Sequence, residues 1–267
     1  MTIDLQSVRK EFVARDGART PAVEDVSLTL GEGEFVVIVG PSGCGKTTVL
    51  NMIAGLERPT AGAILADGRP VTGPGVDRGV MFQDYALFPW RTVAENVAFP
   101  LRFGPAGAGL SGAAIGDRVD ATLTLVGLAA ARDKYPHQLS GGMRQRVALA
   151  RLLSYEPKVL LMDEPLAALD AQTRTILQDE LLRIWGQDGP AASRRTVLFI
   201  THAIDEAVFL ADRVVVMSSH PGRVREIVPV DLPRPRNDAT RADPDFQRIA
   251  QHIWSLIKNE AYRAATS

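Results

Sequence analysis

The stretch GPSGCGKT, Gly40 to Thr47, decides the fold of this chain. It follows the apolar run EFVVIV and precedes a helix-forming segment, so the pattern G-x-x-x-x-G-K-[ST] lies between a buried strand and a helix. Gly43 and Gly45 allow the backbone to wrap around a phosphate group. Lys46 can reach the β- and γ-phosphate oxygens, and the Thr47 hydroxyl can bind Mg²⁺. The sequence therefore predicts a phosphate-binding loop rather than an ordinary glycine-rich turn.

The one cysteine of the chain, Cys44, lies inside this loop. The simplest interpretation is that a small residue fits there. A thiol near the N-terminus of a helix can also be acidified and act as a redox sensor, and the sequence leaves that alternative open. A single cysteine excludes an intrachain disulfide and suits a reducing compartment.

Polar side chains end the neighbouring apolar runs. In VLLMDEP, Val159 to Pro165, Asp163 is placed to hold the Mg²⁺ shell and Glu164 to polarise a water in line with the γ-phosphate. Acid pairs also occur in solvated turns, but beside a phosphate loop the functional interpretation is favoured. The segment FITHAIDEA places His202 at the end of the next strand, where ligands bind in open α/β sheets, although such a histidine can also be structural. Gln83 follows another short strand and can be an ordinary loop residue.

The remaining pattern predicts an α/β fold. Residues 1 to 39 read as short strands, and GAILADGRPV predicts a hairpin at Asp67-Gly68. Residues 92 to 153 are helical, with RFGPAGAGLSGAA as a linker. KVLLMDEP, TRTILQDELLRIWGQ and RTVLFITH form a βαβ unit, and DRVVVMS adds a strand. A proline-rich polar exit then leads to an amphipathic helix whose apolar face holds Phe246, Ile249, Ile253 and Ile257.

Composition limits the classes of function. The 267 residues include 30 basic and 31 acidic side chains, so no overall field favours nucleic acid or an anionic membrane. No apolar run approaches the roughly 18 to 20 residues of a spanning helix, and the N-terminal stretch lacks the apolar segment of a secretory signal. We expect a cytoplasmic protein that reaches a membrane only through a partner.

A second anion-binding pattern occurs in QLSGGMRQR, residues 138 to 146. Ser140, Gly141 and Gly142 run directly into a helix-forming segment, which presents free backbone N–H groups at a helix N-terminus. The presence of two phosphate-binding patterns in one short chain needs an explanation.

The motifs taken together resemble those of a known protein family, and this resemblance explains the two phosphate-binding patterns. Gly40 to Thr47, Gln83, LSGGM, LLMDEP, ALD at 168 to 170 and His202, in this order and spacing, resemble the nucleotide-binding subunit of an ABC transporter over essentially the whole chain. The resemblance implies a P-loop NTPase cassette: a RecA-like α/β core with an antiparallel β subdomain and a helical subdomain inserted at about 92 to 153. It places the ATPase domain at 1 to 220 and a short extension with the amphipathic helix at 221 to 267.

The resemblance also implies the ligands, ATP and Mg²⁺, and the residues that bind them. Phe12 stacks on adenine, Glu164, His202 and Gln83 act in hydrolysis, and Asp170 helps to join two subunits. The metal ligands are Thr47, Gln83 and Asp163. The nucleotide-binding residues are Phe12, Gly40, Pro41, Ser42, Gly43, Cys44, Gly45, Lys46, Thr47, Thr48, Ser140, Gly141, Gly142 and Asp170.

In this family two copies of the chain pair head to tail. Ser140 and Gly142 of one copy then close on the ATP held by Gly40 to Thr47 of the other, so the second device serves the partner's nucleotide. The family usually has glutamine where this chain has Met143. We expect hydrolysis to survive this difference, because Ser140 and the glycine backbone supply the phosphate contacts.

Several short segments resemble the nitrate, sulfonate and taurine importer branch of the family: GPG before DRG, Pro89-Trp90, DAQTR, and PGR at 221 to 223. The apolar segment LFPW beside Gln83 is either a local hydrophobic staple or the wall of a groove that receives a helix of the membrane permease. The resemblance implies a peripheral protein on the cytoplasmic face of the inner membrane, linked indirectly to a solute-binding protein.

Two alternatives differ in class. A non-transport ABC ATPase acting on nucleic acid or ribosomes usually has coiled-coil insertions, tandem cassettes or basic arms, and none is evident in this sequence. An ordinary P-loop kinase would leave LSGGM, ALD and His202 without a purpose.

Overall fold

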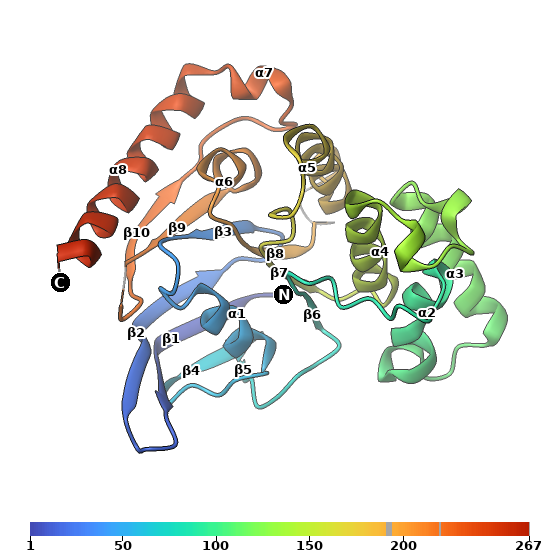
Figure 1. The fold of residues 1–267 in the computed structure, drawn as a ribbon, viewed down its shortest axis with the longest axis horizontal. Helices are drawn as coiled ribbons and strands as arrows, with labels where there is room; N and C mark the ends of the chain where they lie inside the picture. Colours follow the sequence, from blue (N-terminus) through green and yellow to red (C-terminus); the bar gives the residue numbers. More distant parts are fainter. Residues whose placement is uncertain (191–193, 219, 267) are drawn as a thin grey trace.

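A six-stranded sheet forms the centre of the computed structural model, which describes residues 1–190, 194–218 and 220–266 (Figure 1). The strand order is β10-β9-β3-β8-β7-β6, and every neighbouring pair is parallel except β9 and β10. The strands are β3 (Phe35–Val39), β6 (Arg78–Met81), β7 (Val159–Asp163), β8 (Thr196–Ile200), β9 (Arg213–Met217) and β10 (Val224–Pro229). All residues of β3, β7 and β8 are buried, which confirms the sequence prediction for these apolar runs.

A second, antiparallel sheet has the order β2-β1-β4-β5. Its strands are β1 (Ile3–Val13), β2 (Arg19–Leu30), β4 (Ala61–Ala66) and β5 (Arg69–Pro70). The predicted hairpin is confirmed: Asp67 and Gly68 have φ of 45° and 75°, and Ala66 pairs with Arg69. Helix α1 (Lys46–Ala54) packs between the two sheets, where its Val49, Leu50 and Ile53 join a core with residues of β1 and β3.

Three helices form a lobe at one side of the sheets (Figure 1). They are α2 (Val93–Phe103), α3 (Gly112–Leu125) and α4 (Gly141–Ser154), which matches the predicted helical stretch. The expected linker is shorter than predicted. The Ser111 hydroxyl accepts a hydrogen bond from the Ala114 N–H at 3.2 Å, and this N-cap starts α3 within the glycine- and alanine-rich segment.

The face of the six-stranded sheet that is turned away from α1 is covered by helices from the C-terminal half: α5 (Ala171–Trp185), α6 (Ile204–Leu210) and α8 (Pro244–Thr266). The short α7 (Asp238–Arg241) precedes α8 and buries no residue. On α8, Phe246, Ile249 and Ile253 are buried in the same core as Phe35, and Ile257 packs against it, as the amphipathic pattern predicts. Residues after 220 thus add a strand to the sheet and a helix to the core. Of the helices in the described ranges, none has the length and apolar character that a bilayer-spanning segment requires.

The segment between β10 and α7 is fixed by arginines, although its sequence predicts a polar exit. Arg236 is only 2% exposed, and its guanidinium donates to the carbonyls of Val208, Phe209 and Ala211 at 2.6 to 3.1 Å and to those of Val230 and Leu232 at 3.2 and 3.4 Å. The first three carbonyls end α6, where no N–H of the helix can reach them. Burial lowers the pKa of Arg236 to about 9, so the group stays charged at neutral pH.

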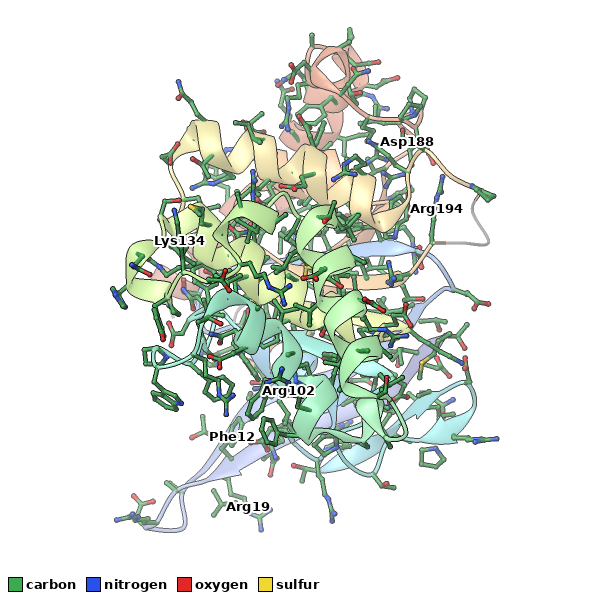
Figure 2. The ribbon with its side chains drawn as sticks, turned by 90° about the vertical axis from the view of Figure 1, so that its right-hand side faces the viewer. Phe12, Arg19, Arg102, Lys134, Asp188 and Arg194 are labelled. Atoms are coloured by element: carbon green, nitrogen blue, oxygen red, sulfur yellow. The ribbon has the colours of Figure 1, made fainter. Side chains whose placement is uncertain are left out.

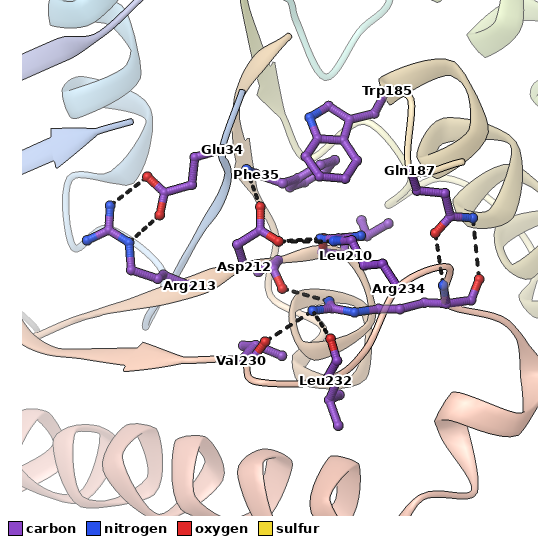
Figure 3. A network of polar contacts seen from close by, with 12 residues as sticks. Glu34, Phe35, Trp185, Gln187, Leu210, Asp212, Arg213, Val230, Leu232 and Arg234 are labelled. Atoms are coloured by element: carbon purple, nitrogen blue, oxygen red, sulfur yellow. Dashed lines mark hydrogen bonds and ion pairs between the residues drawn. The ribbon is translucent and has the colours of Figure 1, made fainter. Parts of the chain in front are cut away.

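Arg234 fixes the same segment together with Arg236, and we call these two arginines the clamp (Figure 3). Arg234 donates to Asp212 Oδ1 at 2.8 Å and to the Leu210 carbonyl, and its guanidinium lies 4.3 Å from the ring of Trp185. The other oxygen of Asp212 accepts a hydrogen bond from the Phe35 N–H at 2.8 Å. The clamp therefore joins the C-terminal segment to α5, to α6 and to the first residue of β3.

We predict that Arg236→Met lowers the free energy of unfolding by about 3 kcal/mol or more, because it leaves buried carbonyls without donors. Urea unfolding measures the change. Arg15→Met is the control, since Arg15 is exposed, and it should change stability by less than about 0.5 kcal/mol. Equal stability of the two variants would contradict the clamp.

Candidate active site

Four predicted site segments follow adjacent strands of the central sheet. The phosphate loop follows β3, His202 follows β8, Asp163 ends β7 and Glu164 follows it, and Gln83 follows β6. Because β3, β8, β7 and β6 are parallel neighbours, their carboxyl ends lie at one edge of the sheet. The topology thus brings together residues that are far apart in the sequence.

The phosphate loop has the backbone that its glycines predict. Gly43 and Gly45 have φ of 76° and 87°, in the left-handed region, and a Cβ on Gly45 would lie 2.8 Å from the Ala22 carbonyl oxygen. The Lys46 ammonium donates to the carbonyls of Gly40 at 2.9 Å and Pro41 at 2.8 Å. The Lys46 side chain is therefore folded back over its own loop. A bound phosphate group can replace these carbonyls as the acceptor of its hydrogen bonds.

Cys44 is buried in the base of the loop. Its side chain is 1% exposed, and burial raises the pKa of the thiol in spite of the nearby Lys46 ammonium. A Cβ on Gly222 would lie 1.9 Å from the Cys44 carbonyl oxygen, so the segment after β9 presses on the loop. These observations favour the small-residue interpretation over the redox sensor. They also identify a neighbour that the motifs did not predict, His220, whose Nε2 would lie 3.4 Å from a Cβ on Gly43.

Asp163 and Thr47 form a pair of oxygen ligands. The Asp163 side chain is buried, and burial raises the pKa of its carboxyl while a hydrogen bond with the Thr47 side chain lowers it. The charge of Glu164 raises this pKa further, and that of Lys46 lowers it. A carboxylate and a hydroxyl beside a phosphate loop are ligands that suit Mg²⁺, so the residues present fit the metal that the sequence predicts.

Glu164 and His202 approach each other across adjacent strands, with Glu164 Oε2 3.4 Å from His202 Nδ1. Glu164 has φ of 45°, an unfavourable conformation for a side chain with a Cβ, and its N–H donates to the Ile200 carbonyl at 3.0 Å. This bond to the end of β8 holds the strained residue in place. His202 is more exposed than Glu164, so the pair opens toward solvent at the sheet edge.

Gln83 is exposed at the start of a loop that the helical lobe anchors. Arg151 of α4 donates to the carbonyls of Tyr85 and Ala86, both at 2.6 Å, and Asn96 of α2 bonds the N–H and the carbonyl of Phe88. Neither anchor was predicted from the sequence, since an arginine and an asparagine in amphipathic helices are usually solvent-facing.

A groove of about 320 Å³ lies beside this loop, between it and the helices α2 and α4. The residues that line it include Phe82, Phe88, Phe99, Arg151 and Tyr155. Phe88 packs on Phe99 with ring centroids 4.4 Å apart, so Phe88 acts as a local hydrophobic staple. Trp90 is 70% exposed, which a staple does not explain.

Two other predicted site residues, Ser140 and Asp170, cap helices instead of bonding to residues at the sheet edge. The Ser140 hydroxyl caps α4 by accepting from the Met143 N–H at 3.3 Å, and the Asp170 carboxylate caps α5 by accepting from the Thr173 N–H at 3.0 Å. The Met143 side chain is half-buried against the larger core, so methionine suits its surroundings.

Phe12 lies on the long β1–β2 ribbon, which extends from the rest of the molecule (Figure 2). It is 42% exposed, and the Lys10 ammonium is 5.0 Å from its ring centroid. Its ring is therefore available for stacking.

Comparison with known proteins agrees with the motifs and the fold. The family model of the ABC transporter matches residues 23–167. The chain is 49% identical to the nitrate import ATP-binding protein NrtD of Synechococcus elongatus, over 88% of this chain and 84% of that protein. It is 43% identical to the aliphatic sulfonates import ATP-binding protein SsuB of Bacillus licheniformis, over 95% of this chain and 93% of that protein.

A solved structure shows the same architecture. It is an ATP-binding cassette captured as a dimer in a post-hydrolysis state with ADP and Pi, with a TM-score of 0.73 and 33% identity over 85% of this chain and 98% of that chain. The fold is therefore that of an ABC ATPase cassette. Its motifs, its fold and its relatives agree that this chain belongs to the ABC transporter family, as an ATP-binding subunit with ATPase activity.

Proposed function

We propose that this chain powers the import of a small solute such as nitrate, a sulfonate or taurine, as one of two ATPase subunits bound to a membrane permease. The observation that carries the proposal is that the predicted site residues fall into two separate groups. Lys46, Asp163, Glu164 and His202 lie along one sheet edge, whereas Ser140 and Asp170 cap helices of their own. The 41% to 49% identity to nitrate and sulfonate import proteins supports the importer branch.

The roles at the sheet edge follow from chemistry. Residues 40 to 48 bind the ATP phosphates, with Phe12 against the adenine. Thr47, Asp163 and Gln83 hold Mg²⁺, which neutralises phosphate charge when bound. Glu164 polarises the attacking water as a general base, and His202 contacts the γ-phosphate. The 3.4 Å distance between His202 Nδ1 and Glu164 Oε2 supports roles for both side chains at the same phosphate group.

Ser140, Gly141, Gly142 and Asp170 serve the second copy of the chain. A head-to-tail dimer would place the N-terminus of α4 on the partner's ATP, where its N–H groups favour negative charge. The solved relative is a dimer, which supports this arrangement. ATP binding then favours the closed dimer, and hydrolysis reopens it.

The groove beside residues 82 to 90 receives a helix of the permease, which carries dimer closure to the membrane subunits. Its aromatic lining and the exposed Trp90 suit helix-in-groove recognition. The subunit works at the cytoplasmic face of the inner membrane, and a solute-binding protein acts on the other side of the permease. Nucleic acid has no place in this proposal, since the charge is balanced and relatives are named for import.

We predict that Glu164→Gln reduces ATP turnover by about 100-fold or more and traps an ATP-loaded dimer, because an amide cannot act as the base. Steady-state phosphate release and size-exclusion chromatography with ATP measure the two effects. Turnover close to that of the unmodified protein would remove Glu164 from this role.

Trp90→Ala should weaken binding to the permease by about 30-fold, since an aromatic side chain that becomes buried at an interface is worth about 2 kcal/mol. Co-purification with the permease in detergent measures the loss. Trp254→Ala is the matched control, because Trp254 is 56% exposed on α8 and should keep the permease bound. Equal retention of the permease by both variants would argue against the groove.

Deletion of the gene should abolish growth on one of nitrate, taurine, alkanesulfonates, cyanate or pyrimidine precursors as sole nitrogen or sulfur source. Uptake of the labelled solute then identifies the substrate directly. Unimpaired growth on every candidate, with ATPase activity stimulated by nucleic acid, would instead support the non-transport class.

A further inference from the structure

The N-termini of α4 and α5 lie against each other within one chain. Both helices are capped by the residues that the proposed dimer would present to its partner, Ser140 and Asp170. The fourth helical residue of each bonds to the residue before its N-cap: Arg144 donates to the Leu139 carbonyl at 2.7 Å, and Arg174 to the Leu169 carbonyl at 2.9 Å. The two ends are therefore built alike.

The contact between them depends on a glycine. A Cβ on Gly142 would lie 2.8 Å from the Cγ2 methyl of Thr173, closer than a real Cβ contact allows. A Cβ on Gly141 would lie 3.8 Å from Leu169 Cδ2, which is ordinary van der Waals contact. Gly142 is thus the position where the backbone of α4 lies directly on a side chain of α5.

Thr173 also contacts the N-cap of α5. Its N–H donates to the Asp170 carboxylate at 3.0 Å, and the Thr173 hydroxyl acts with this N–H to lower the pKa of Asp170. Hydroxyl and methyl share one Cβ, so a single rotamer turns the hydroxyl toward Asp170 and places the methyl on Gly142. One side chain therefore contacts both partner-facing N-termini.

We propose that Thr173 is a positioning residue that makes Ser140–Gly142 and Asp170 move as one unit when the ATP dimer closes. The proposal rests on the dimer proposed above. It gives Gly142 a role inside its own chain, separate from any contact with the partner's nucleotide. Thr173 links a contact on the partner's phosphates to the contact that joins the subunits.

The test compares Gly142→Ala, Thr173→Ser and the double variant, all in Glu164→Gln so that ATP is not consumed. Thr173→Ser keeps the hydroxyl for Asp170 and removes the methyl that an alanine at 142 would strike. We expect Gly142→Ala to raise the ATP concentration for half-maximal dimerisation about tenfold, equivalent to 1.4 kcal/mol, and Thr173→Ser to restore most of this loss in the double variant. A double variant as impaired as Gly142→Ala would overturn the proposal and assign the loss to the partner's nucleotide.

Two further measurements separate positioning from misfolding. Binding of a fluorescent ATP analogue to the monomer should stay the same in the Thr173 variants, because the phosphate loop lies outside the α4–α5 contact. Thr173→Val keeps the methyl and removes the hydroxyl, so it should also raise the ATP midpoint, and serine should be the milder change at 173 alone. A valine variant with an unchanged midpoint would overturn the link to Asp170. If the parent never dimerises with ATP, the proposed function fails as well, whereas failed rescue alone leaves it standing.

Discussion

Parallel pairing of β3 with β8 and of β8 with β7 is the constraint on which the rest of this protein depends. The pairing aligns Ile38 with Ile200 and Asp163 with Ile200, so the residues that follow each strand leave the sheet at the same level. A lysine, two carboxylates and a histidine from distant parts of the sequence are thereby brought to one edge of the sheet. Covering both faces of such a sheet needs two cores, and β3 supplies both by turning Phe35, Val37 and Val39 to one side and Val36 and Ile38 to the other.

The helical lobe and the C-terminal segment have different relations to this edge. The lobe holds the loop after β6, where Arg151 and Asn96 bond to backbone carbonyls and one N–H. Bonds to the backbone fix the path of that loop, while the Trp90 side chain near its end stays exposed. The C-terminal segment instead closes the core: Arg236 supplies the donors that α6 lacks, and α6 begins two residues after His202.

Sequence alone predicted the sheet edge because its signals are local. A glycine-rich loop between a buried strand and a helix, and apolar runs that end in polar residues, are complete within a few positions. The clamp had no such signal, since LPRPRN resembles an exposed linker and only the unpaired carbonyls of α6, far away in the sequence, explain why Arg236 is buried. Ile176 shows the converse: it recurs with Leu181, Leu182 and Trp185 as an apolar residue of TRTILQDELLRIWGQ, which predicts a buried position, and yet it is 58% exposed. The contact between Gly142 and Thr173 could not be predicted for a third reason. Each residue lies in a different segment of the sequence, and only the packing of α4 on α5 shows that they touch.

The close packing of Gly222 on the carbonyl of Cys44 has a practical consequence. The Cys44 thiol is itself buried beneath the loop, and the chain has no other cysteine. A thiol reagent added to this protein therefore reacts only when the structure opens around Cys44. The sequence thus carries its own probe for the opening of the phosphate loop, with no label to introduce and no competing residue to remove.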